Sequence, residues 1–472
     1  MKSLKNALTI AAFAAAVVIG GFPISARQAV PAASKPAASA AATVTELNVN
    51  GLKVLVKERP GSQTVAAGLF IRGGSRNVTA SNAGIEALML SVATEASVNV
   101  PREQFRRELA RTGTVVGSGI NRDYSAFTLG CTREHFDAAW ALFSDAAMHP
   151  SFDPADFDRV KTRQLISLRS DSDTPDSALQ AQVSRVIYAG HPYANDPNGT
   201  IASMQSLTLD DLKRFHREIM QTSRLLLVIV GDLSAESIRQ RVDASFGKLP
   251  RGDYKAAPVA PLAFTQPTVD ITAKGLPTNY VQGTYAAPGP DSPDIYPLRV
   301  ANAILRGLVY EEVREKRALS YAPDAFIGGA SANTGGIYVT AVDANQAVDV
   351  MLRQIGRLRA SDVNREAITA TAQDFLTQYY MGQETNAAQT GSLASAELLG
   401  GGWRTAEEFI TRIRAVTPAD MRRVVTTYMR NMQFVVLGDP AKIDKRIFLQ
   451  GSGGDPLPAL VRRPRAETRG PR

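Results

Sequence analysis

Hydrophobic and polar positions along this chain follow two different periods, which alternate from one segment to the next. Short segments that alternate every second residue predict strands, and longer segments with apolar residues at every third or fourth position predict helices. The predicted strands cover residues 52–56, 65–71, 125–131, 281–286 and 336–342. The predicted helices cover residues 83–97, 102–112, 136–147, 154–170, 177–188, 295–308, 344–359 and 364–381. The first two strands flank the turn Arg59-Pro60-Gly61, which predicts a hairpin, and the mixture of elements indicates an α+β fold.

Two segments, residues 207–233 and 416–440, repeat the same order of features. Each opens with a threonine three residues before an aspartate, a relative of the helix capping box, and continues into an amphipathic helix. A short polar break and a continuous apolar strand that ends in Gly-Asp follow in both copies. The copies lie about 200 residues apart, too far for a solenoid repeat, so we predict two homologous domains at residues 44–255 and 267–448. Residues 256–266, rich in proline and alanine, form the predicted linker.

The composition is that of a soluble globular protein, with 44% hydrophobic and 21% charged residues among 472 positions. The formal net charge of +8 comes largely from the two ends of the chain, where Lys2, Lys5 and a C-terminal group of arginines lie. The folded body is therefore close to neutral, and the sequence has no basic stripe with interleaved aromatic residues. These features argue against a nucleic-acid partner.

Residues 1–26 have the organisation of a secretory signal peptide, with a positively charged start, a short apolar core and a small-residue cleavage site. Residues 27–43 are predicted to be a flexible linker, and residues 449–472 a disordered basic tail. No later segment is apolar enough to cross a membrane, so the mature chain is predicted to have no transmembrane span. Export together with this composition indicates a bacterial periplasm, and a single cysteine, Cys131, excludes an internal disulfide framework.

Candidate metal chemistry in the first half centres on Cys131, Glu134 and His135, which read C-x-x-E-H. Zinc can use these residue types as ligands. The predicted strand end at Cys131, followed by Thr132 as the cap of the next helix, would keep them off a common helical face. A structural role is therefore the better interpretation, and residual metal binding at Cys131 and His135 stays an open alternative. The remaining histidines are scattered and are expected to pack or to cap turns: His149, His191 and His216.

A second candidate site is the stretch VYEEVREKRALSYA, which contains Arg314 and, seven residues later, Tyr321. The proline that follows the stretch predicts a helix end near residues 319–320, which places Tyr321 just beyond it. A guanidinium and a phenol hydroxyl placed in this way can hold a carbonyl oxygen from two sides. The alternative is an ordinary solvated helix face, since the stretch is rich in charge and Glu312 with Lys316 is a common i,i+4 pair.

The order of these parts resembles the insulinase/pitrilysin family of zinc peptidases, the inverzincins, over residues 44–447. The segments that carry the resemblance are GLKVLVKERPGSQTVAAGLFIRGGSR, HPYANDPNGT before the first repeat copy, and REKRALSY in the second half. The resemblance implies two homologous domains, each a mixed and mostly antiparallel sheet covered by helices, as in mitochondrial processing peptidase. Together the two domains would form half of a clamshell around a peptide.

Zinc-binding members of that family carry H-x-x-E-H on the helix after the first hairpin, where two histidines ligate the metal and the glutamate is the general base. The matching helix here has Ala87 and Ser91 in place of the histidines and Leu90 in place of the glutamate. The later helix that would supply a further ligand offers Gln164 and Ser167 but no carboxylate. The resemblance therefore implies that this chain has lost the zinc site and carries no cofactor itself.

The family's second half carries an arginine and a tyrosine that bind the substrate backbone and help to stabilise the tetrahedral intermediate. Arg314 and Tyr321 match this pair in type, spacing and context. The resemblance thus favours the non-zinc-binding subunit of a periplasmic heterodimeric metallopeptidase, with peptide substrates and a zinc-bearing partner of the same family. The alternative is a catalytically inactive scaffold or peptide-binding protein in a larger envelope complex. A solitary metallopeptidase that uses Cys131, Glu134 and His135 is the least favoured interpretation.

Overall fold

The structure is a computed structural model of the chain, in which residues 43–170, 174–360 and 365–450 are described. The predicted signal peptide lies outside these residues, as do the predicted linker before residue 43 and the predicted tail from residue 451 onward. Across the described ranges, no helix combines the length and the apolar character that a membrane span requires.

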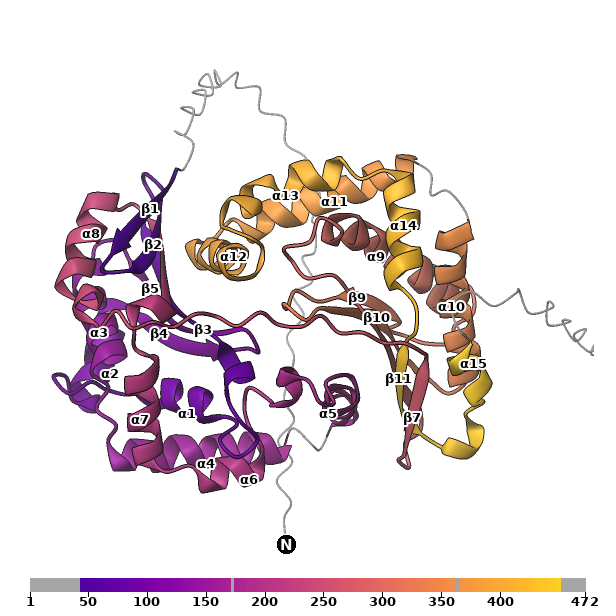
Figure 1. The fold of residues 1–472 in the computed structure, drawn as a ribbon, viewed down its shortest axis with the longest axis horizontal. Helices are drawn as coiled ribbons and strands as arrows, with labels where there is room; N and C mark the ends of the chain where they lie inside the picture. Colours follow the sequence, from indigo (N-terminus) through magenta and orange to yellow (C-terminus); the bar gives the residue numbers. More distant parts are fainter. Residues whose placement is uncertain (1–42, 171–173, 361–364, 451–472) are drawn as a thin grey trace, which may run out of the picture. The chain divides into compact units, whose positions relative to one another are not determined.

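A six-stranded sheet, with strand order β1-β2-β6-β3-β5-β4, forms the centre of the first half (Figure 1). Its strands are β1 (Val44–Val49), β2 (Leu52–Glu58), β3 (Thr64–Arg72), β4 (Val115–Ile120), β5 (Tyr124–Thr132) and β6 (Leu225–Gly231). All neighbouring pairs are antiparallel except β2 and β6, which run parallel. The sheet is therefore mixed and mostly antiparallel, as the family resemblance implied.

The predicted hairpin between β2 and β3 is wrong, because β6 lies between these two strands. Every residue of β6 is buried, and a strand that is apolar on both faces is buried most fully at the centre of a sheet. The turn Arg59-Pro60-Gly61 therefore connects strands that are two positions apart. β2 instead forms a hairpin with β1 through Asn50 and Gly51, whose φ angles are 49° and 84°. Asn-Gly with two positive φ angles is typical of a tight type I′ turn.

A five-stranded sheet, with strand order β7-β11-β8-β10-β9, forms the centre of the second half. Its strands are β7 (Thr268–Ala273), β8 (Asn279–Ala286), β9 (Asp324–Ile327), β10 (Thr334–Ala341) and β11 (Gln433–Gly438). β11 runs parallel to β7 and antiparallel to β8, as β6 runs parallel to β2 and antiparallel to β3. The two halves therefore share one topology, which is the outcome expected from an internal duplication.

The helices cover the faces of the two sheets. The first half contains α1 (Ile85–Ala93), α2 (Arg102–Thr112), α3 (Phe136–Met148), α4 (Pro154–Ser170), α5 (Pro175–Ile187), α6 (Ile201–Ser206), α7 (Leu209–Ile219) and α8 (Ala235–Ala244). The second half contains α9 (Ile295–Val309), α10 (Ala344–Ala360), α11 (Arg365–Gly382), α12 (Asn386–Leu399), α13 (Arg404–Arg414), α14 (Pro418–Tyr428) and α15 (Lys445–Leu449). α2 and α4 have the predicted bounds.

The repeated segments that predicted the duplication form α7 with β6 in the first half and α14 with β11 in the second. Thr208 and Asp211 form a reciprocal capping box at the start of α7. Thr417 and Asp420 form the same capping box at the start of α14. The Thr-x-x-Asp signal in the sequence therefore marks the start of a helix in both copies.

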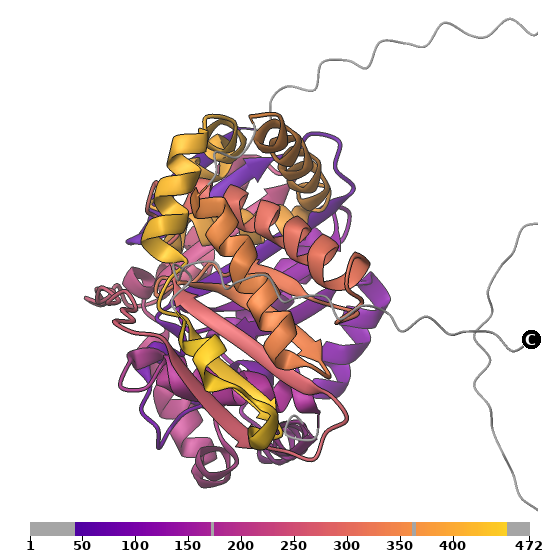
Figure 2. The same ribbon diagram turned by 90° about the vertical axis from the view of Figure 1, so that its right-hand side faces the viewer.

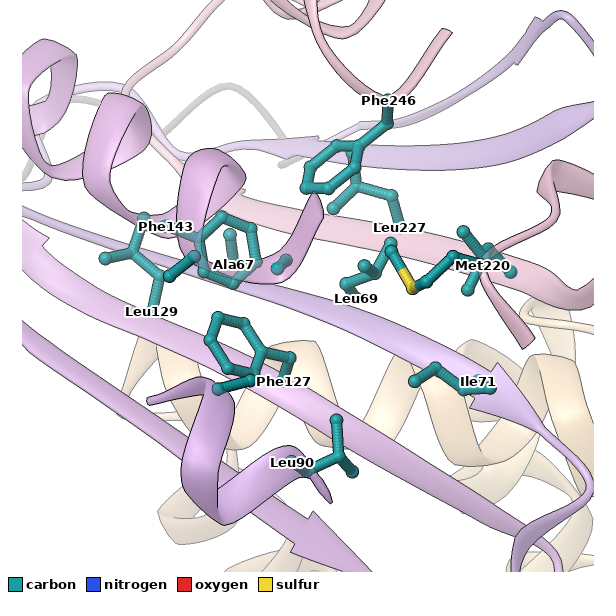
Figure 3. Packing of buried hydrophobic residues seen from close by; sticks show 14 of the residues in the cluster. Ala67, Leu69, Ile71, Leu90, Phe127, Leu129, Phe143, Met220, Leu227 and Phe246 are labelled. Carbon is teal, nitrogen blue, oxygen red and sulfur yellow. The ribbon is translucent and has the colours of Figure 1, made fainter. Parts of the chain in front are cut away.

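One face of the first sheet packs against α1, α3 and α7 in a large apolar core. Figure 3 shows aromatic side chains from a strand, a helix and a connecting segment gathered at its centre. The ring centroids of Phe127 and Phe143 lie 5.5 Å apart, and those of Phe143 and Phe246 lie 5.9 Å apart. These rings pack α3 against the sheet, within the same core cluster that contains the buried residues of α1.

On its other face, each sheet is covered by a helix that belongs to the other half of the chain. α12 of the second half packs on β3 and β6, where Leu393 contacts the same cluster as Leu226. α5 of the first half packs on one face of β11, where Leu179 shares a cluster with Leu437. Phe434 of β11 belongs to the cluster on the other face, together with residues of α10. α5 and α10 therefore lie on opposite faces of this strand (Figures 1 and 2). β6 and β11 are therefore covered on both faces, which explains their unbroken apolar runs.

Candidate functional site

The positions that correspond to the family's zinc ligands come together on two contacting helices, α1 and α4. Ala87 and Leu90 of α1 are buried, and Ser91 lies at the edge of the same helix face. Gln164 of α4 reaches across, so that its Nε2 donates a hydrogen bond to Ser91 Oγ at 3.0 Å. Ser167, the other residue considered on α4, is exposed. The fold thus preserves the meeting point of the two helices although the residue types have changed.

These residues do not fit a zinc ion. Alanine and leucine provide no ligand, and the hydroxyl of Ser91 is already engaged with the amide of Gln164. Zinc in proteins takes histidine nitrogen, cysteine sulfur or carboxylate oxygen. Within the described ranges, no group of three or more His, Cys, Asp or Glu side chains is placed to hold a metal ion. The chemistry of the residues present therefore agrees with the predicted loss of the zinc site.

One carboxyl group does lie on α1, and the sequence analysis did not single it out. Glu86 is 1% exposed, and its Oε1 accepts a hydrogen bond from the hydroxyl of Ser125 on β5. Its Oε2 has no partner among the described residues. Burial raises the pKa of Glu86, and the hydrogen bond from Ser125 and the charge of Arg224 oppose that rise. Glu86 is therefore a buried acid that ties α1 to the sheet, and a lone glutamate in an apolar helix was its signal in the sequence.

The C-x-x-E-H segment is spread over a strand end and the start of a helix. Cys131 is a buried residue of β5, and burial raises the pKa of its thiol to about 11. His135, and not Thr132 as predicted, occupies the residue before α3, because the helix starts at Phe136. A thiol with a raised pKa is a poor metal ligand at neutral pH. The strand end and the start of the helix therefore keep Cys131 and His135 off a common helical face, as the sequence analysis expected.

The other histidines pack or cap turns, as expected. His191 Nδ1 accepts the backbone N–H of Tyr193 at 3.1 Å and thereby shapes the His-Pro-Tyr turn. His216 is buried against the carbonyl of Ala147, and burial lowers its pKa. His149 pairs with Asp145 one turn earlier on α3. None of the three lies in a metal-binding group of the described chain.

The segment that carries Arg314 differs from the predicted helix in its ending. α9 continues into a π-helical turn, Tyr310–Glu315, and the chain then turns at Ala318, whose φ is 51°. The N–H of Leu319 bonds to the carbonyl of Val313 at 2.9 Å and closes the turn. The predicted helix end near residues 319–320 is therefore several residues too late, because Ala318 leaves the right-handed region. Tyr321 lies beyond the helix, as predicted.

Arg314 and Tyr321 are in direct contact. The guanidinium carbon of Arg314 lies 4.1 Å from the centroid of the Tyr321 ring, and its Nη1 donates to the Tyr321 carbonyl oxygen at 2.9 Å. Tyr310 contacts the guanidinium as well, with its ring centroid 5.0 Å away. Arg314 is therefore held between two aromatic rings. The sequence analysis missed Tyr310, although an aromatic residue four positions before an arginine in a helix was a usable signal.

Arg314 has no ion pair in the described chain, because the neighbouring acidic residues Glu311 and Glu312 pair with Lys316 and Arg317. Glu312 accepts hydrogen bonds from Lys316 at 2.8 Å and from Arg317, which together lower its pKa. The predicted Glu312–Lys316 pair is therefore present. The Tyr321 side chain is 79% exposed, and its hydroxyl makes no hydrogen bond with the described residues. A guanidinium edge and a free phenol hydroxyl thus face solvent together, an arrangement that can hold a carbonyl oxygen.

Comparison with known families and proteins agrees with this structural description. Residues 53–200 match the insulinase family, peptidase family M16, and residues 206–374 match the peptidase M16 inactive domain. The chain is 20% identical to the uncharacterized zinc protease YmxG of Bacillus subtilis, over 78% of this chain and 91% of that protein. It is 24% identical to the non-peptidase homolog YmxG of Helicobacter pylori, over 45% and 50%. It is 23% identical to the mitochondrial-processing peptidase subunit beta of Blastocladiella emersonii, over 54% and 55%.

Solved structures share the fold over most of the chain. A peptidase M16 inactive domain from Pseudomonas fluorescens superimposes with a TM-score of 0.77 and 18% identity, covering 84% of this chain and 98% of that one. A chain of complex III2 from Candida albicans superimposes with a TM-score of 0.74 and 18% identity, covering 86% and 99%. The matches to both segments of the family, the shared fold and the changed residues of α1 and α4 lead to one conclusion. The chain belongs to the insulinase family, peptidase family M16, as a homologue that lacks the zinc ligands.

Proposed function

We propose that this protein is the non-zinc-binding subunit of a periplasmic heterodimeric insulinase-family metallopeptidase. In this role it binds peptide and supplies Arg314 and Tyr321 to the zinc site of a partner subunit. One observation carries the proposal: the arginine and tyrosine are assembled and face solvent, whereas α1 and α4 have no metal ligands. A chain that keeps only the substrate-binding part of a site needs a second chain to complete it.

The chemistry assigned to this chain is the stabilisation of negative charge on the scissile carbonyl oxygen. Arg314 Nη1 is engaged with the Tyr321 carbonyl, so its other N–H groups remain available to an incoming oxygen. The rings of Tyr310 and Tyr321 hold the guanidinium in place before substrate arrives, which reduces the reorganisation needed in the transition state. The Tyr321 hydroxyl would donate a second hydrogen bond.

Substrate binding in this proposal uses a sheet edge of the first half. β4 is an edge strand that contacts α1, and Val115 at its start is 67% exposed. An exposed edge strand can pair with an extended peptide through backbone hydrogen bonds. The substrates would therefore be peptides or unfolded segments rather than folded proteins. The relatives support a paired arrangement, since one is a subunit of a processing peptidase and another is called a non-peptidase homolog.

A second candidate function is a catalytically inactive scaffold or peptide-binding protein in a larger envelope complex. The observation that favours it is the likeness of the fold to a chain of complex III2. On this view the contact between Arg314 and Tyr321 is residual, and Nη1 remains bonded to the Tyr321 carbonyl. Purification from the native envelope distinguishes the two candidates, because the first requires a partner that carries H-x-x-E-H and the second requires a membrane complex.

The decisive experiment is a peptidase assay of this chain alone and after mixing with a candidate H-x-x-E-H subunit. We expect no cleavage by the chain alone and cleavage by the mixture. Arg314→Ala should lower turnover of the mixture by about 10²–10³-fold, the usual effect of removing one oxyanion donor, without dissociating the complex. Arg357→Ala, at an exposed position on α10, is the matched control and should have no effect. Unchanged turnover in Arg314→Ala would count against the assignment.

A further inference from the structure

The second half contains two neighbouring cavities that share one side chain, Arg299 of α9. The larger cavity, of about 680 Å³, lies among α9, α11 and β9, and the smaller, of about 290 Å³, lies among α9, α12 and α13. We call the larger one the Arg299 cavity. Its walls also include Asn302 and Arg306 of α9, Phe326 of β9 and Asp374 of α11. A cavity of this size accommodates a ligand the size of a short peptide.

Arg299 has no ion pair and no hydrogen bond within the described chain, and its guanidinium carbon lies 5.5 Å from the centroid of the Phe409 ring. Arg299 is half-buried, and this burial lowers its pKa. Arg306, two turns along the same helix, differs because its Nε lies 2.7 Å from Asp324 Oδ1. A desolvated guanidinium without a counter-ion is costly to keep in a fold. The lack of a protein anion at Arg299 therefore points to an anion from outside the chain.

A second group in the Arg299 cavity lacks a partner. Asn302 is 6% exposed and lies one helical turn from Arg299. Its Nδ2 donates to the carbonyl of Ala325 at 3.1 Å, whereas its Oδ1 accepts no hydrogen bond from the described residues. Buried amide oxygens are normally satisfied, so this one can accept a hydrogen bond from a donor outside the described chain, such as the N–H group of a ligand. The ligand therefore needs a negative charge and, beside it, an N–H group.

The remaining walls restrict the ligand further. Asp374 faces the cavity from α11 and would repel an anion that carries several charges. Phe326 and Phe375 provide apolar surface for a side chain. A single carboxylate, an adjacent amide N–H and an apolar side chain occur together at the C-terminal end of a peptide.

The position of the cavity in the fold gives an independent reason to expect a site. α9 follows β8 and contacts α11 and β9, as α1 follows β3 and contacts α4 and β4 in the first half. The Arg299 cavity thus occupies the place in the second half where the first half holds the positions of the lost zinc ligands. Guanidinium groups at this place suit an anion, as histidines at the equivalent place suit a metal cation.

We propose that the Arg299 cavity binds the C-terminal carboxylate of a short peptide. Arg299 would donate two hydrogen bonds to the carboxylate, and Asn302 Oδ1 would accept the N–H of the last peptide bond. The choice of a peptide rests on the proposed function: hydrolysis adds water across an amide bond and leaves a new carboxylate on one fragment and an ammonium group on the other. The site itself does not require Arg314, Tyr321 or a partner subunit.

Isothermal titration calorimetry on the mature chain tests this inference. The probes are N-acetyl-alanyl-phenylalanine with a free carboxylate, the same dipeptide as its C-terminal amide, and inorganic phosphate. We expect the free acid to bind, the amide to bind at least about tenfold more weakly, and phosphate not to compete. Equal binding of acid and amide, or no binding of the acid, would overturn the proposal. If phosphate competes with the free acid, the cavity is a general anion site, and the assignment of a peptide C-terminus as its ligand is overturned.

Substitutions at Arg299 separate binding from structure. Arg299→Met should reduce affinity for the free acid by about tenfold or more. Arg299→Lys should have an intermediate effect, because lysine keeps the positive charge but cannot donate two parallel hydrogen bonds to a carboxylate. Arg357→Met on α10 is the matched control and should bind as the natural chain does. Loss of the unpaired cation should leave the melting temperature unchanged or raise it. Unchanged affinity in Arg299→Met, or a large fall in its melting temperature with affinity retained, would assign Arg299 a purely structural role.

The peptide-binding result is distinguishable from failure of the proposed function, because calorimetry uses this chain without a partner and the peptidase assay uses the mixture. Binding without peptidase activity would retain the site and remove the catalytic proposal. Peptidase activity of the mixture without peptide binding to the isolated chain would retain the catalytic proposal and remove the Arg299 site.

Discussion

Glu86 and Glu95 are buried carboxyl groups near the two ends of α1, 1% and 4% exposed, and we expect them to respond to pH in opposite directions. Burial raises the pKa of Glu86, which has one hydrogen bond, from Ser125. Burial also acts to raise the pKa of Glu95, but hydrogen bonds and charges from Arg106, Arg159 and Arg102 outweigh it and lower the pKa. The two residues thus form a matched pair of the same residue type at similar burial.

The sign of each effect follows from linkage between protonation and folding. Because the folded pKa of Glu86 exceeds the unfolded value, its neutral form contributes stability below about pH 4.5, and that stability is lost as pH rises toward the folded pKa. Each pH unit within this window removes about 1.4 kcal/mol. Glutamine keeps the shape and the acceptor for Ser125 without ionising. Glu86→Gln should therefore be nearly neutral at about pH 4.5 and raise the free energy of unfolding by about 1–3 kcal/mol at pH 7.

Glu95→Gln should show the opposite slope. Its folded pKa is lowered, so the carboxylate contributes stability above the unfolded pKa and loses it as pH falls through the folded value. Glutamine keeps an acceptor oxygen but removes the negative charge that the surrounding arginines pair with, which should cost about 1.5–3 kcal/mol at pH 7. The cost should shrink as pH falls below about 4.5, because the unfolded chain is protonated there first and the folded carboxylate follows only at its lowered pKa.

Urea unfolding followed by circular dichroism, at pH values between about 3 and 8, measures both differences from the midpoint and the slope of each transition, and the range extends below the unfolded pKa of glutamate so that the Glu95 effect falls within it. The natural chain, Glu86→Gln and Glu95→Gln are compared at each pH. A Glu86→Gln variant that is destabilised at pH 7 by an amount independent of pH would refute the raised pKa of Glu86. Slopes of the same sign in the two variants would refute the account of the whole pair.

Three further predictions concern the site, the contact between the halves and metal. Tyr310→Leu should lower turnover of the mixed complex by about tenfold, because Arg314 loses one of the two rings that hold it, and the steady-state rate of peptide cleavage measures this. Tyr193→Phe should lower the free energy of unfolding by about 1–3 kcal/mol in urea, because the Tyr193 hydroxyl donates to Asp123 at 2.5 Å and accepts from the N–H of Ala332 at 3.2 Å. Treatment with a chelator should leave the melting temperature of the purified chain unchanged, and a clear fall on chelation would reveal a metal site.

Sequence patterns predicted the bounds of single helices and strands better than they predicted which strands pair with each other. The bounds of α2 and α4 followed from hydrophobic periodicity, because each helix has one apolar face and clear ends. The insertion of β6 between β2 and β3 could not be predicted in this way, since pairing across almost the whole domain leaves no local signal. The β1–β2 hairpin was within reach, because Asn50-Gly51 is a strong turn signal that the analysis did not use.

The candidate site was predictable where a residue pair had a fixed spacing and unpredictable where the contact came from tertiary structure. Arg314 and Tyr321 were singled out from their spacing together with the family resemblance, and a π-helical turn and a left-handed Ala318 bring them together instead of a longer helix. The meeting of Ser91 and Gln164 followed only from the resemblance. Arg299 gave no signal at all, because an arginine without a counter-ion becomes visible only when its surroundings are known.

The shared topology of the two halves gives each half an equivalent position at which a site can form. Each half forms the same meeting point of two helices and an edge strand, because the same strand order and the same exchanged helices hold it there. In the first half the meeting point is occupied by a neutral hydrogen bond between Ser91 and Gln164, which holds α1 against α4 without an ion. In the second half the equivalent point carries Arg299, which lacks a partner in the described chain. The position of Arg299 beside the cavity, without an ion pair in the described chain, is therefore the observation that supports a bound anion.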